Sequence, residues 1–375
     1  MGRSHRGAAI PNAKAIHVLH VIESLGGGVT SAVRDYLAST PHVRHTVVAR
    51  IRLQDDTGES LEGLADKVVW APKALPDAVR LVGRTFDDLG PDVVHAHSSF
   101  GGVWARLARI PKQRIVYTPH CFAFERQDLG RIPRALCWAA EATLARRTAV
   151  VAGVSPRELE LARAMRRNQH TAYIPNVARL PEGLVRPHQQ INTSLTVVTA
   201  GRVGPQKDPA FFAAVAAALT AHEPRPRVRW LGGGDERSEA ALREAGVEVT
   251  GWIPRNHVLN QLSSADVYVH TAAWEGAPIT VLEAASLGLP IVARRIPALA
   301  ALGLDLLADT PQALAGLVLD LHDPALHEQA IGGSQRLRSR HQPADQERAL
   351  AELYTRVASY GEDAGSSRSG RPQAS

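Results

Sequence analysis

The strongest constraint on the fold is an alternation of short apolar runs with helical stretches, and this alternation occurs twice along the 375 residues. The first set of apolar runs comprises residues 14–22, 46–52, 68–70, 92–96, 114–117 and 149–154. After a segment rich in Pro, Gly, Gln and Asn (178–193), a second set comprises residues 195–200, 227–231, 247–250, 266–271 and 290–293. Strands that alternate with helices indicate a parallel sheet covered on both faces. The sequence therefore predicts an α/β protein with two doubly wound, Rossmann-like domains.

Two glutamates eight residues apart, Glu275 and Glu283, follow an apolar run that is typical of a buried strand (265–272). Pro278 suits a first helical position, and residues 279–286 continue as a helix. In an open α/β sheet, ligands bind at the carboxyl ends of the strands. A carboxylate can accept hydrogen bonds from two neighbouring hydroxyls of a sugar or ribose. The spacing favours a site in which the two glutamates bind two linked polyols. A capping carboxylate and a solvated helix residue would give the same pattern.

A loop with two cations follows the strand predicted at residues 195–200. Arg202 and Lys207 lie in a loop that contains glycine, and Asp208 and Pro209 provide the N-cap and first residue of an Ala-rich helix. Positive charge and free backbone amides at the end of a strand suit a diphosphate. Two solvated loop cations are the alternative. Together with the two glutamates, the loop favours a diphosphate between two polyols, which is a nucleotide-sugar.

Several shorter motifs accompany these two elements. In chain order the whole set is Gly26–Gly28, 92–98, 117–120, 154–155, 174–177, the loop 201–209, 231–235, 251–254 and 275–283. With this set, spread over roughly residues 15–295, the chain resembles the retaining glycosyltransferases of family 4, also called glycosyl transferases group 1. The resemblance implies the GT-B fold, in which two Rossmann-like domains with doubly wound parallel sheets face a central cleft.

The resemblance also implies that the two domains bind different substrates. Residues 14–180 are expected to form an N-terminal acceptor-binding domain, and residues 181–343 a C-terminal domain that binds the nucleotide-sugar. A last helix, near 344–359, is expected to cross back onto the first domain. Residues 1–13 are expected to be a disordered leader and residues 361–375 a disordered tail.

The roles of individual residues follow from the same resemblance. Glu283 is expected on the ribose hydroxyls and Glu275 on the sugar, while His120 is expected to donate a hydrogen bond to a sugar hydroxyl. The catalytic residues would be His120, Arg202, Lys207 and Glu275. The donor would be bound by Gly27, Gly28, Arg202, Lys207, Gly233, Trp252, Ile253, Glu275, Gly276, Ala277, Pro278, Ile279 and Glu283. The acceptor would be bound by Gly28, Ser98 and His120.

Metal chemistry is not expected. His95 and His97 alternate on one predicted strand, but the sequence shows no third ligand at a suitable spacing and no Asp-x-Asp pattern. The implied reaction therefore needs no metal and no other cofactor, with Arg202 and Lys207 neutralising the leaving diphosphate. It would retain the anomeric configuration of the sugar.

The charge is unevenly distributed, with 25 Lys and Arg against 17 Asp and Glu in residues 1–185. Much of the excess lies in the segment Arg126–Arg167, where apolar side chains such as Leu136 and Trp138 are interspersed. This segment is predicted either to dock on an anionic membrane surface or to be a solvated basic face. No nucleic-acid-binding module is recognisable, so nucleic acid is not an expected partner. The expected location is the cytoplasm, including the inner face of the cell membrane.

The sequence thus predicts an enzyme that moves a sugar from a nucleotide-diphosphate donor to a hydroxyl of a glycan or lipid-linked acceptor. Assembly of a bacterial surface polysaccharide or glycolipid is the expected setting. A small soluble acceptor, a nucleotide-sugar 2-epimerase and a non-catalytic nucleotide-sugar-binding module are the alternatives. The stretch Arg294–Ala298 departs from the family pattern. Sequence alone identifies neither the nucleotide base nor the sugar nor the acceptor.

Overall fold

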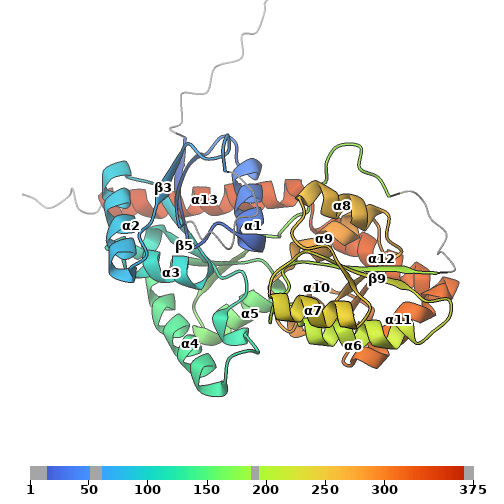
Figure 1. The fold of residues 1–375 in the computed structure, drawn as a ribbon. Helices are drawn as coiled ribbons and strands as arrows, with labels where there is room; N and C mark the ends of the chain where they lie inside the picture. The colour runs from blue at the N-terminus through green and yellow to red at the C-terminus, as the bar shows by residue number, and fades with distance from the viewer. Residues whose placement is uncertain (1–14, 51–60, 187–193, 367–375) are drawn as a thin grey trace, which may run out of the picture.

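Two parallel sheets, each with helices on both faces, lie side by side in the molecule (Figure 1). The structure is a computed structural model and describes residues 15–50, 61–186 and 194–366. The predicted leader therefore lies outside the described residues, as does most of the predicted tail. Within the described ranges, no helix has both the length and the apolar character needed to cross a membrane.

The first sheet has seven strands in the order β3-β2-β1-β4-β5-β6-β7, and every pair is parallel. These strands are β1 (His17–Ile22), β2 (Arg44–Ala49), β3 (Lys67–Trp70), β4 (Val93–His97), β5 (Ile115–Thr118), β6 (Val150–Gly153) and β7 (His170–Tyr173). Both faces of the central strands are buried, which explains why their sequences read as continuous apolar runs. The strand order reverses between β1 and β4, and such a switch point is where ligands bind in doubly wound sheets.

The helices of the first domain connect consecutive parallel strands. The α-helices are α1 (Gly27–Ser39), α2 (Leu75–Leu89), α3 (Ser98–Leu107), α4 (Arg131–Leu144) and α5 (Pro156–Met165). Short 3-10 turns are η2 (Lys112–Arg114), η3 (Ala123–Glu125) and η4 (Ala145–Arg147). Helix α4 projects from the lower edge of this domain in the view of Figure 1.

The second sheet repeats the architecture with six strands in the order β10-β9-β8-β11-β12-β13. Its strands are β8 (Thr196–Ala200), β9 (Arg227–Leu231), β10 (Glu248–Val249), β11 (Val267–His270), β12 (Ile291–Arg294) and β13 (Leu307–Ala308). Its helices are α6 (Pro209–Thr220), α7 (Glu236–Glu244), α8 (Arg255–Ser263), α9 (Ile279–Ser286), α10 (Pro297–Leu302), α11 (Pro311–Leu319), η5 (Asp320–His322) and α12 (Pro324–Arg340). Here the order reverses between β8 and β11. The predicted fold class, with two doubly wound parallel-sheet domains, is confirmed.

The last helix, α13 (Pro343–Ser366), runs from the second domain across the first (Figure 1). Leu350, Leu353 and Tyr354 are fully or almost fully buried in one core cluster with Val18 of β1. The Tyr354 hydroxyl lies 2.9 Å from Nδ1 of His95 in β4. The helix continues through residue 366, so it includes residues 361–366 of the predicted tail.

Several element boundaries differ from the prediction in ways that matter for the site. Helix α1 begins at Gly27 and helix α3 begins at Ser98, so these residues lie in helix N-termini and not in preceding loops. Pro278 is the N-cap of α9 instead of its first residue. The edge strands β7 and β13 were not predicted, because the first is polar and the second has two residues.

Candidate active site

The loops after β8 and β11 bring the predicted cation Lys207 and the predicted acid Glu275 together. The two strands are neighbours in the sheet, so their carboxyl ends lie at the same edge. Lys207 Nζ lies 2.5 Å from Glu275 Oε1, and Gln206 Nε2 donates to Oε2 at 3.2 Å. The backbone of this loop is held in turn, because Thr271 Oγ1 donates to the Lys207 carbonyl at 2.9 Å. Glu275 is only 8% exposed, and α9 has no side-chain hydrogen bond at its N-cap, so the alternative reading of Glu275 as a capping carboxylate is wrong.

Electrostatics keep Glu275 ionised. Burial alone would raise the pKa of its carboxyl, but Lys207 and His270 lower the pKa to about 2. His270 Nε2 lies 3.5 Å from Glu275 Oε1. Burial and the charge of Lys207 lower the pKa of His270, and the imidazole is therefore neutral near pH 7. The site thus holds one negative and one positive charge in close contact.

The second predicted acid, Glu283, lies on α9 and is 4% exposed. Arg255, at the start of α8, donates to Glu283 Oε1 through Nε at 3.1 Å and through Nη2 at 2.6 Å. The same Nη2 donates to the Arg179 carbonyl at 3.2 Å. The reading of Glu283 as a solvated helix residue is therefore also wrong. In this structure the predicted ribose-binding carboxylate is paired with an arginine that the sequence analysis did not identify.

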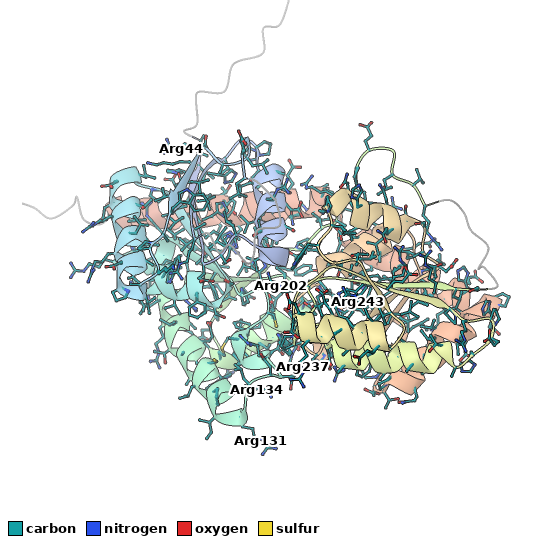
Figure 2. All side chains as sticks on the ribbon, in the orientation of Figure 1. Arg44, Arg131, Arg134, Arg202, Arg237 and Arg243 are labelled. Atoms are coloured by element: carbon teal, nitrogen blue, oxygen red, sulfur yellow. The ribbon has the colours of Figure 1, made fainter. Side chains whose placement is uncertain are left out.

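Arg202 and Trp252 form the outer part of the second domain's site. The guanidinium carbon of Arg202 lies 5.9 Å from the centre of the Trp252 ring, within cation–π range. Trp252 is 57% exposed. A Cβ at Gly233 would lie 3.1 Å from the Trp252 amide nitrogen, so the backbone passes closely beneath the tryptophan. Ile253 next to it is half-buried, and Arg202 lies where the two domains meet (Figure 2).

The first domain contacts this site through the turn that follows β5. A Cβ at Gly276 would lie 2.7 Å from Glu158 Oε1, 3.0 Å from the Cys121 nitrogen and 3.3 Å from the His120 carbonyl carbon. His120 and Cys121 have φ angles of 49° and 83°, in the left-handed region that non-glycine residues rarely adopt. Nearby, Asn176 Nδ2 donates to the Ala277 carbonyl at 2.9 Å. The backbone of His120 and the segment that begins at Gly276 are therefore close neighbours.

Glu158 holds this turn and was missed in the sequence analysis. Its Oε1 accepts a hydrogen bond from the Cys121 nitrogen at 2.6 Å, and its Oε2 accepts one from the Val154 nitrogen at 2.8 Å. Burial raises the pKa of this carboxyl to about 7. A signal was present, because Ser155 and Glu158 have the spacing of a capping box at the start of α5. That pattern identifies the helix start but not the contact with Cys121.

Three predicted residues remain apart from the contacts described so far. Gly27 and Gly28 form the start of α1, where Gly27 has a φ of 65°. Ser98 is the first residue of α3 and has a φ of 57°. Among the described residues, no hydrogen bond or ion pair joins any of the three to the second domain. Their donor and acceptor roles stay predictions, as does that of Ile279, the first residue of α9.

A row of buried histidines lies behind His120. His120 Nε2 lies 3.2 Å from His97 Nδ1, and His97 Nε2 lies 3.1 Å from His20 Nδ1. His20 Nε2 lies 3.1 Å from His45 Nδ1, and His45 Nε2 lies 3.1 Å from the Thr40 carbonyl. The four imidazoles come from β1, β2, β4 and the turn after β5, which adjacent parallel strands bring together.

Two histidines of this row, His20 and His97, lie close enough to His95 for the three to hold a metal ion. Nitrogen atoms of His20, His95 and His97 lie within 4.8 Å of one another. The expectation that His95 and His97 lack a third possible ligand is wrong, because His20 lies beside them. His95 already pairs with the Tyr354 hydroxyl at 2.9 Å and with Thr118 Oγ1 at 2.8 Å. Every ring nitrogen of these three histidines thus has a protein partner, and the metal-free site stays a prediction.

The departure from the family pattern at Arg294 has a structural explanation. Arg294 Nη1 donates to Asp208 Oδ2 at 2.7 Å, and its guanidinium carbon lies 4.5 Å from the centre of the Phe211 ring. Asp208 also caps α6 through the Phe211 nitrogen, as predicted. Arg294 therefore braces the end of the loop that carries Arg202 and Lys207.

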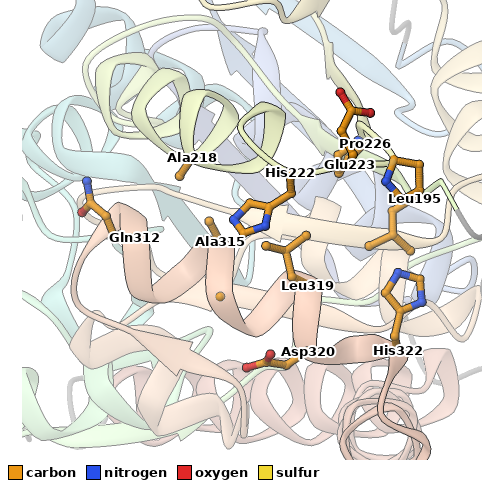
Figure 3. A pocket seen from close by; sticks show the side chains of 12 residues that line it. Leu195, Ala218, His222, Glu223, Pro226, Gln312, Ala315, Leu319, Asp320 and His322 are labelled. Atoms are coloured by element: carbon orange, nitrogen blue, oxygen red, sulfur yellow. The ribbon is translucent and has the colours of Figure 1, made fainter.

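The cavity shown in Figure 3 lies elsewhere. It has a volume of about 620 Å³ and is lined by the end of α6, by one side of α11, and by Leu195 and Pro226, which precede β8 and β9. Leu195, Pro226 and the end of α6 lie at the amino ends of the strands, on the opposite edge of the sheet from Lys207 and Glu275. Ligands of doubly wound sheets bind at the carboxyl ends, so this cavity is not the donor site.

Known protein families match both halves of the chain. The family "Glycosyl transferase 4-like domain" matches residues 27–177, and the family "Glycosyl transferases group 1" matches residues 194–323. A UDP-Gal:alpha-D-GlcNAc-diphosphoundecaprenol alpha-1,3-galactosyltransferase from Escherichia coli is 28% identical over 237 residues. That match covers 55% of this chain and 58% of the relative, so it spans little more than half of the relative's length.

Solved structures share the fold at low sequence identity. Sucrose-phosphate synthase from Thermosynechococcus elongatus superposes with a TM-score of 0.74 at 17% identity, over 92% of this chain and 100% of that one. HepE from Anabaena, solved with UDP and glucose, superposes with a TM-score of 0.69 at 17% identity, over 91% and 99%. The fold and the family matches define the class, a glycosyltransferase with the GT-B fold. Within that class, the chain belongs to the retaining glycosyltransferases of family 4.

Proposed function

We propose that this glycosyltransferase moves a sugar from a nucleotide-diphosphate-sugar to a hydroxyl of a lipid-linked or glycan acceptor, in the assembly of a bacterial surface polysaccharide or glycolipid. The observation that carries the proposal is the Lys207–Glu275 pair at the switch point of the second sheet. Lys207 is a cation that can bind a diphosphate, Glu275 is an acid that can bind sugar hydroxyls, and the two are in contact there. The lipid-linked acceptor is supported by the Escherichia coli relative, whose name specifies a diphosphoundecaprenol acceptor.

In this proposal the charged residues of the site pair with one another when the donor is absent. When the donor binds, it replaces these pairs with its own contacts. The diphosphate takes over Lys207 and is also met by Arg202, which releases Glu275 to accept hydrogen bonds from the sugar. Glu283 turns from Arg255 to the ribose hydroxyls. The first backbone N–H groups of α9 lack intrahelical acceptors and add positive potential toward the phosphates. All of these groups lie on the second domain, while His120 reaches the sugar from the first.

The chemical step breaks the bond between the sugar's anomeric carbon and the diphosphate oxygen, and it forms a bond from the same carbon to the acceptor oxygen. The acceptor's hydroxyl proton passes to the departing diphosphate oxygen on the same face of the sugar, which retains the configuration. Lys207 and Arg202 stabilise the negative charge that develops on the diphosphate. In this proposal the two cations do this without a metal ion.

The test combines a binding panel with a transfer assay. Thermal shifts of the full chain with UDP-, GDP- and ADP-sugars identify the donor, because a ligand that binds only the folded state stabilises it. Transfer of the labelled sugar is then measured with undecaprenyl-diphosphate-linked sugars as acceptors. Lys207→Ala should lower turnover at least about a hundredfold, the scale of losing a preorganised charge. Lys112→Ala, an exposed lysine in the first domain, is the matched control. Near-normal turnover of Lys207→Ala would refute the assigned role.

The same assay separates the alternatives. Interconversion of two nucleotide-sugars without any acceptor would indicate an epimerase. Transfer only to water-soluble hydroxyl compounds, and not to lipid-linked sugars, would indicate a small soluble acceptor. A thermal shift with no turnover on any acceptor would indicate a non-catalytic nucleotide-sugar-binding module.

Helix α4 favours a membrane surface as the place of the reaction. Its inner face is held by Glu141, which accepts hydrogen bonds from Arg106 at 2.8 Å and from the Tyr117 hydroxyl at 3.0 Å. On its outer side, Ile132 is 75% exposed and Leu136 is 66% exposed. An exposed apolar helical face beside arginines suits the boundary between lipid headgroups and acyl chains. We therefore propose that α4 docks on an anionic membrane.

Two arginines of this region also bind backbone carbonyls of the first domain. Arg147 donates to the carbonyls of Ala108 and Ile110, and Arg134 donates to the Phe124 carbonyl. The test is co-sedimentation with phosphatidylglycerol vesicles and with phosphatidylcholine vesicles. The double variant Ile132→Ser and Leu136→Ser should lose binding to the anionic vesicles. Val185→Ser, which changes an equally exposed apolar residue elsewhere, should keep it. Equal binding by both variants would refute the docking surface.

A further inference from the structure

Four imidazoles, those of the buried His45, His20 and His97 and of the partly exposed His120, form a continuous hydrogen-bonded row that starts at the Thr40 carbonyl. The successive nitrogen–nitrogen distances are 3.1 Å, 3.1 Å and 3.2 Å, and the Thr40 carbonyl lies 3.1 Å from His45 Nε2. His20 and His97 are completely buried, and His45 is almost completely buried. His120 at the other end is partly exposed, and its backbone lies beside the segment that begins at Gly276. The row therefore connects the interior of the first domain to the candidate active site.

The hydrogen bond between His45 and Thr40 determines the direction in which the imidazoles of the row donate. A carbonyl oxygen can only accept a hydrogen bond, so His45 Nε2 must carry a proton and donate it to the Thr40 carbonyl. The Thr40 hydroxyl offers no alternative donor, because it donates to the Tyr36 carbonyl at 2.8 Å. Its oxygen can accept from the same His45 Nε2, which lies 3.1 Å away.

Each ring of the row carries a single proton near neutral pH. Burial lowers the pKa of His20 and His97 well below the usual value, and it lowers the pKa of His120 to about 3. Burial also lowers the pKa of His45. A neutral imidazole has one N–H donor and one nitrogen acceptor. Since His45 Nε2 is the donor, His45 Nδ1 is an acceptor, and His20 Nε2 must donate to it.

The same argument applies ring by ring along the row. His20 Nδ1 accepts from His97 Nε2, and His97 Nδ1 accepts from His120 Nε2. Any other arrangement would place two N–H groups or two lone pairs face to face at a buried contact. We propose that this row fixes His120 as the Nε2–H tautomer, so that its Nδ1 is presented as a hydrogen-bond acceptor to a hydroxyl group of the substrate. His97, His20 and His45 are then positioning residues.

The proposal rests on the proposed function only for the nature of the substrate hydroxyl. It reverses the polarity expected from the sequence, where His120 was predicted to donate a hydrogen bond. Among the described residues, His120 Nδ1 has no hydrogen-bond partner, so this nitrogen is available to a ligand. The backbone supports the same placement, because Glu158 holds the nitrogen of the adjacent Cys121 at 2.6 Å.

The direct test measures the tautomers in the full-length protein without any donor. Long-range ¹H–¹⁵N NMR spectra of ¹⁵N-histidine-labelled protein at pH 7 distinguish Nε2–H, Nδ1–H and imidazolium rings. The expected result is the neutral Nε2–H form at His45, His20, His97 and His120, assigned through single substitutions. An Nδ1–H or imidazolium form at any of the four would overturn the proposal. One equivalent of bound transition metal in the purified protein, by elemental analysis, would also overturn it.

Two variants of His20 separate a polar relay from simple packing. A glutamine side chain donates through its amide nitrogen and accepts through its oxygen, so His20→Gln can preserve the direction of the row. His20→Met fills a similar space but interrupts the row. We expect His120 to stay in the Nε2–H form in His20→Gln and to show a mixture of tautomers in His20→Met. His257→Gln, a change at an exposed histidine on α8, should leave the His120 signals unchanged.

The turnover of the same variants provides the functional readout. With the donor identified in the binding panel, His20→Met should lower turnover roughly tenfold, the scale of one lost hydrogen bond, and His20→Gln should restore it. An unchanged His120 tautomer in His20→Met would overturn the proposal, whatever the turnover. If the tautomers are as expected but no donor is turned over, the proposed function fails and the tautomer assignment stands.

Discussion

The contact between the two domains at Gly276 can be tested with a single methyl group. The Cβ of alanine at this position would lie 2.7 Å from Glu158 Oε1 and 3.0 Å from the Cys121 nitrogen. Real Cβ atoms essentially never come closer than 3.0 Å to another heavy atom. The φ of Gly276 lies outside the left-handed region, so Gly276→Ala introduces a steric conflict without backbone strain.

The size of the effect follows from what must move. Glu158 is buried and bonded to two backbone N–H groups, so its carboxylate is not a flexible end that swings away. Overpacking of this kind costs about 1–3 kcal/mol. If the domains separate locally to relieve the conflict, this energy opposes their closure on the donor. Turnover should then fall by between about fivefold and about a hundredfold, at about 1.4 kcal/mol for each factor of ten.

Three measurements are made on the Gly276→Ala variant. Urea unfolding reports the change in the free energy of unfolding, and the initial rate of sugar transfer reports closure on the donor. Hydrogen exchange at the Cys121 and Val154 amides, which both donate to Glu158, reports the local contact without any substrate. Faster exchange at these two amides is expected in Gly276→Ala.

A matched glycine serves as the control. Gly316 lies inside α11, and a Cβ there would meet no atom within 4 Å. Gly316→Ala should therefore stabilise the protein by about 0.5–1 kcal/mol through the unfolded state and leave turnover unchanged. If Gly276→Ala matched the wild type in exchange, stability and turnover, the described contact between the domains would be wrong.

Four further predictions concern charged groups. The folded pKa of Glu275, about 2, lies below the usual value of 4.5, so its contribution is present above pH 4.5 and lost as the pH falls toward 2. This loss amounts to about 3 kcal/mol of unfolding free energy and should be absent in Glu275→Gln. Glu141→Ala leaves the buried Arg106 charge unpaired and should cost about 3–5 kcal/mol in urea unfolding. Arg294→Ala should cost less than about 1 kcal/mol because its pair with Asp208 is partly exposed. Asp208→Ala should cost about 2–3 kcal/mol, since it removes an N-cap at a residue with a φ of 50°.

The controls for these predictions use the same unfolding assay. Glu352→Gln, a change at an exposed residue of α13, should show the same acid-dependent loss as the wild type. A wild-type loss no larger than that of Glu275→Gln would contradict the assigned pKa. Equal costs for Arg294→Ala and Asp208→Ala would show that the ion pair, and not the cap, sustains the start of α6.

The sequence was sufficient for the parts of the fold and site that depend on local patterns. Buried parallel strands read as continuous apolar runs, and caps such as Asp208 with Pro209 mark helix starts within the sequence itself. Once two adjacent strands are recognised, the ends of both must meet at one edge of the sheet. The proximity of Lys207 and Glu275 follows from this rule, and the structure shows it.

Contacts between distant segments could not be predicted in the same way. The histidine row requires the register of β1, β2 and β4, which no single stretch of sequence contains. Arg255 was missed because an exposed helix start gives no sign that it faces Glu283. Sequence counts charges, but it does not reveal that guanidinium groups such as that of Arg147 bind backbone carbonyls.

Helix α13 affects when the first domain can complete its folding during synthesis. The first seven strands leave the ribosome well before Leu350, Leu353 and Tyr354 are translated, yet these side chains complete the wall against which β1 and β4 pack. Domains usually fold in the order of their synthesis. Here the half that is made first can bury this part of its core only when the final helix arrives, so its packing is completed after the second half has been synthesised.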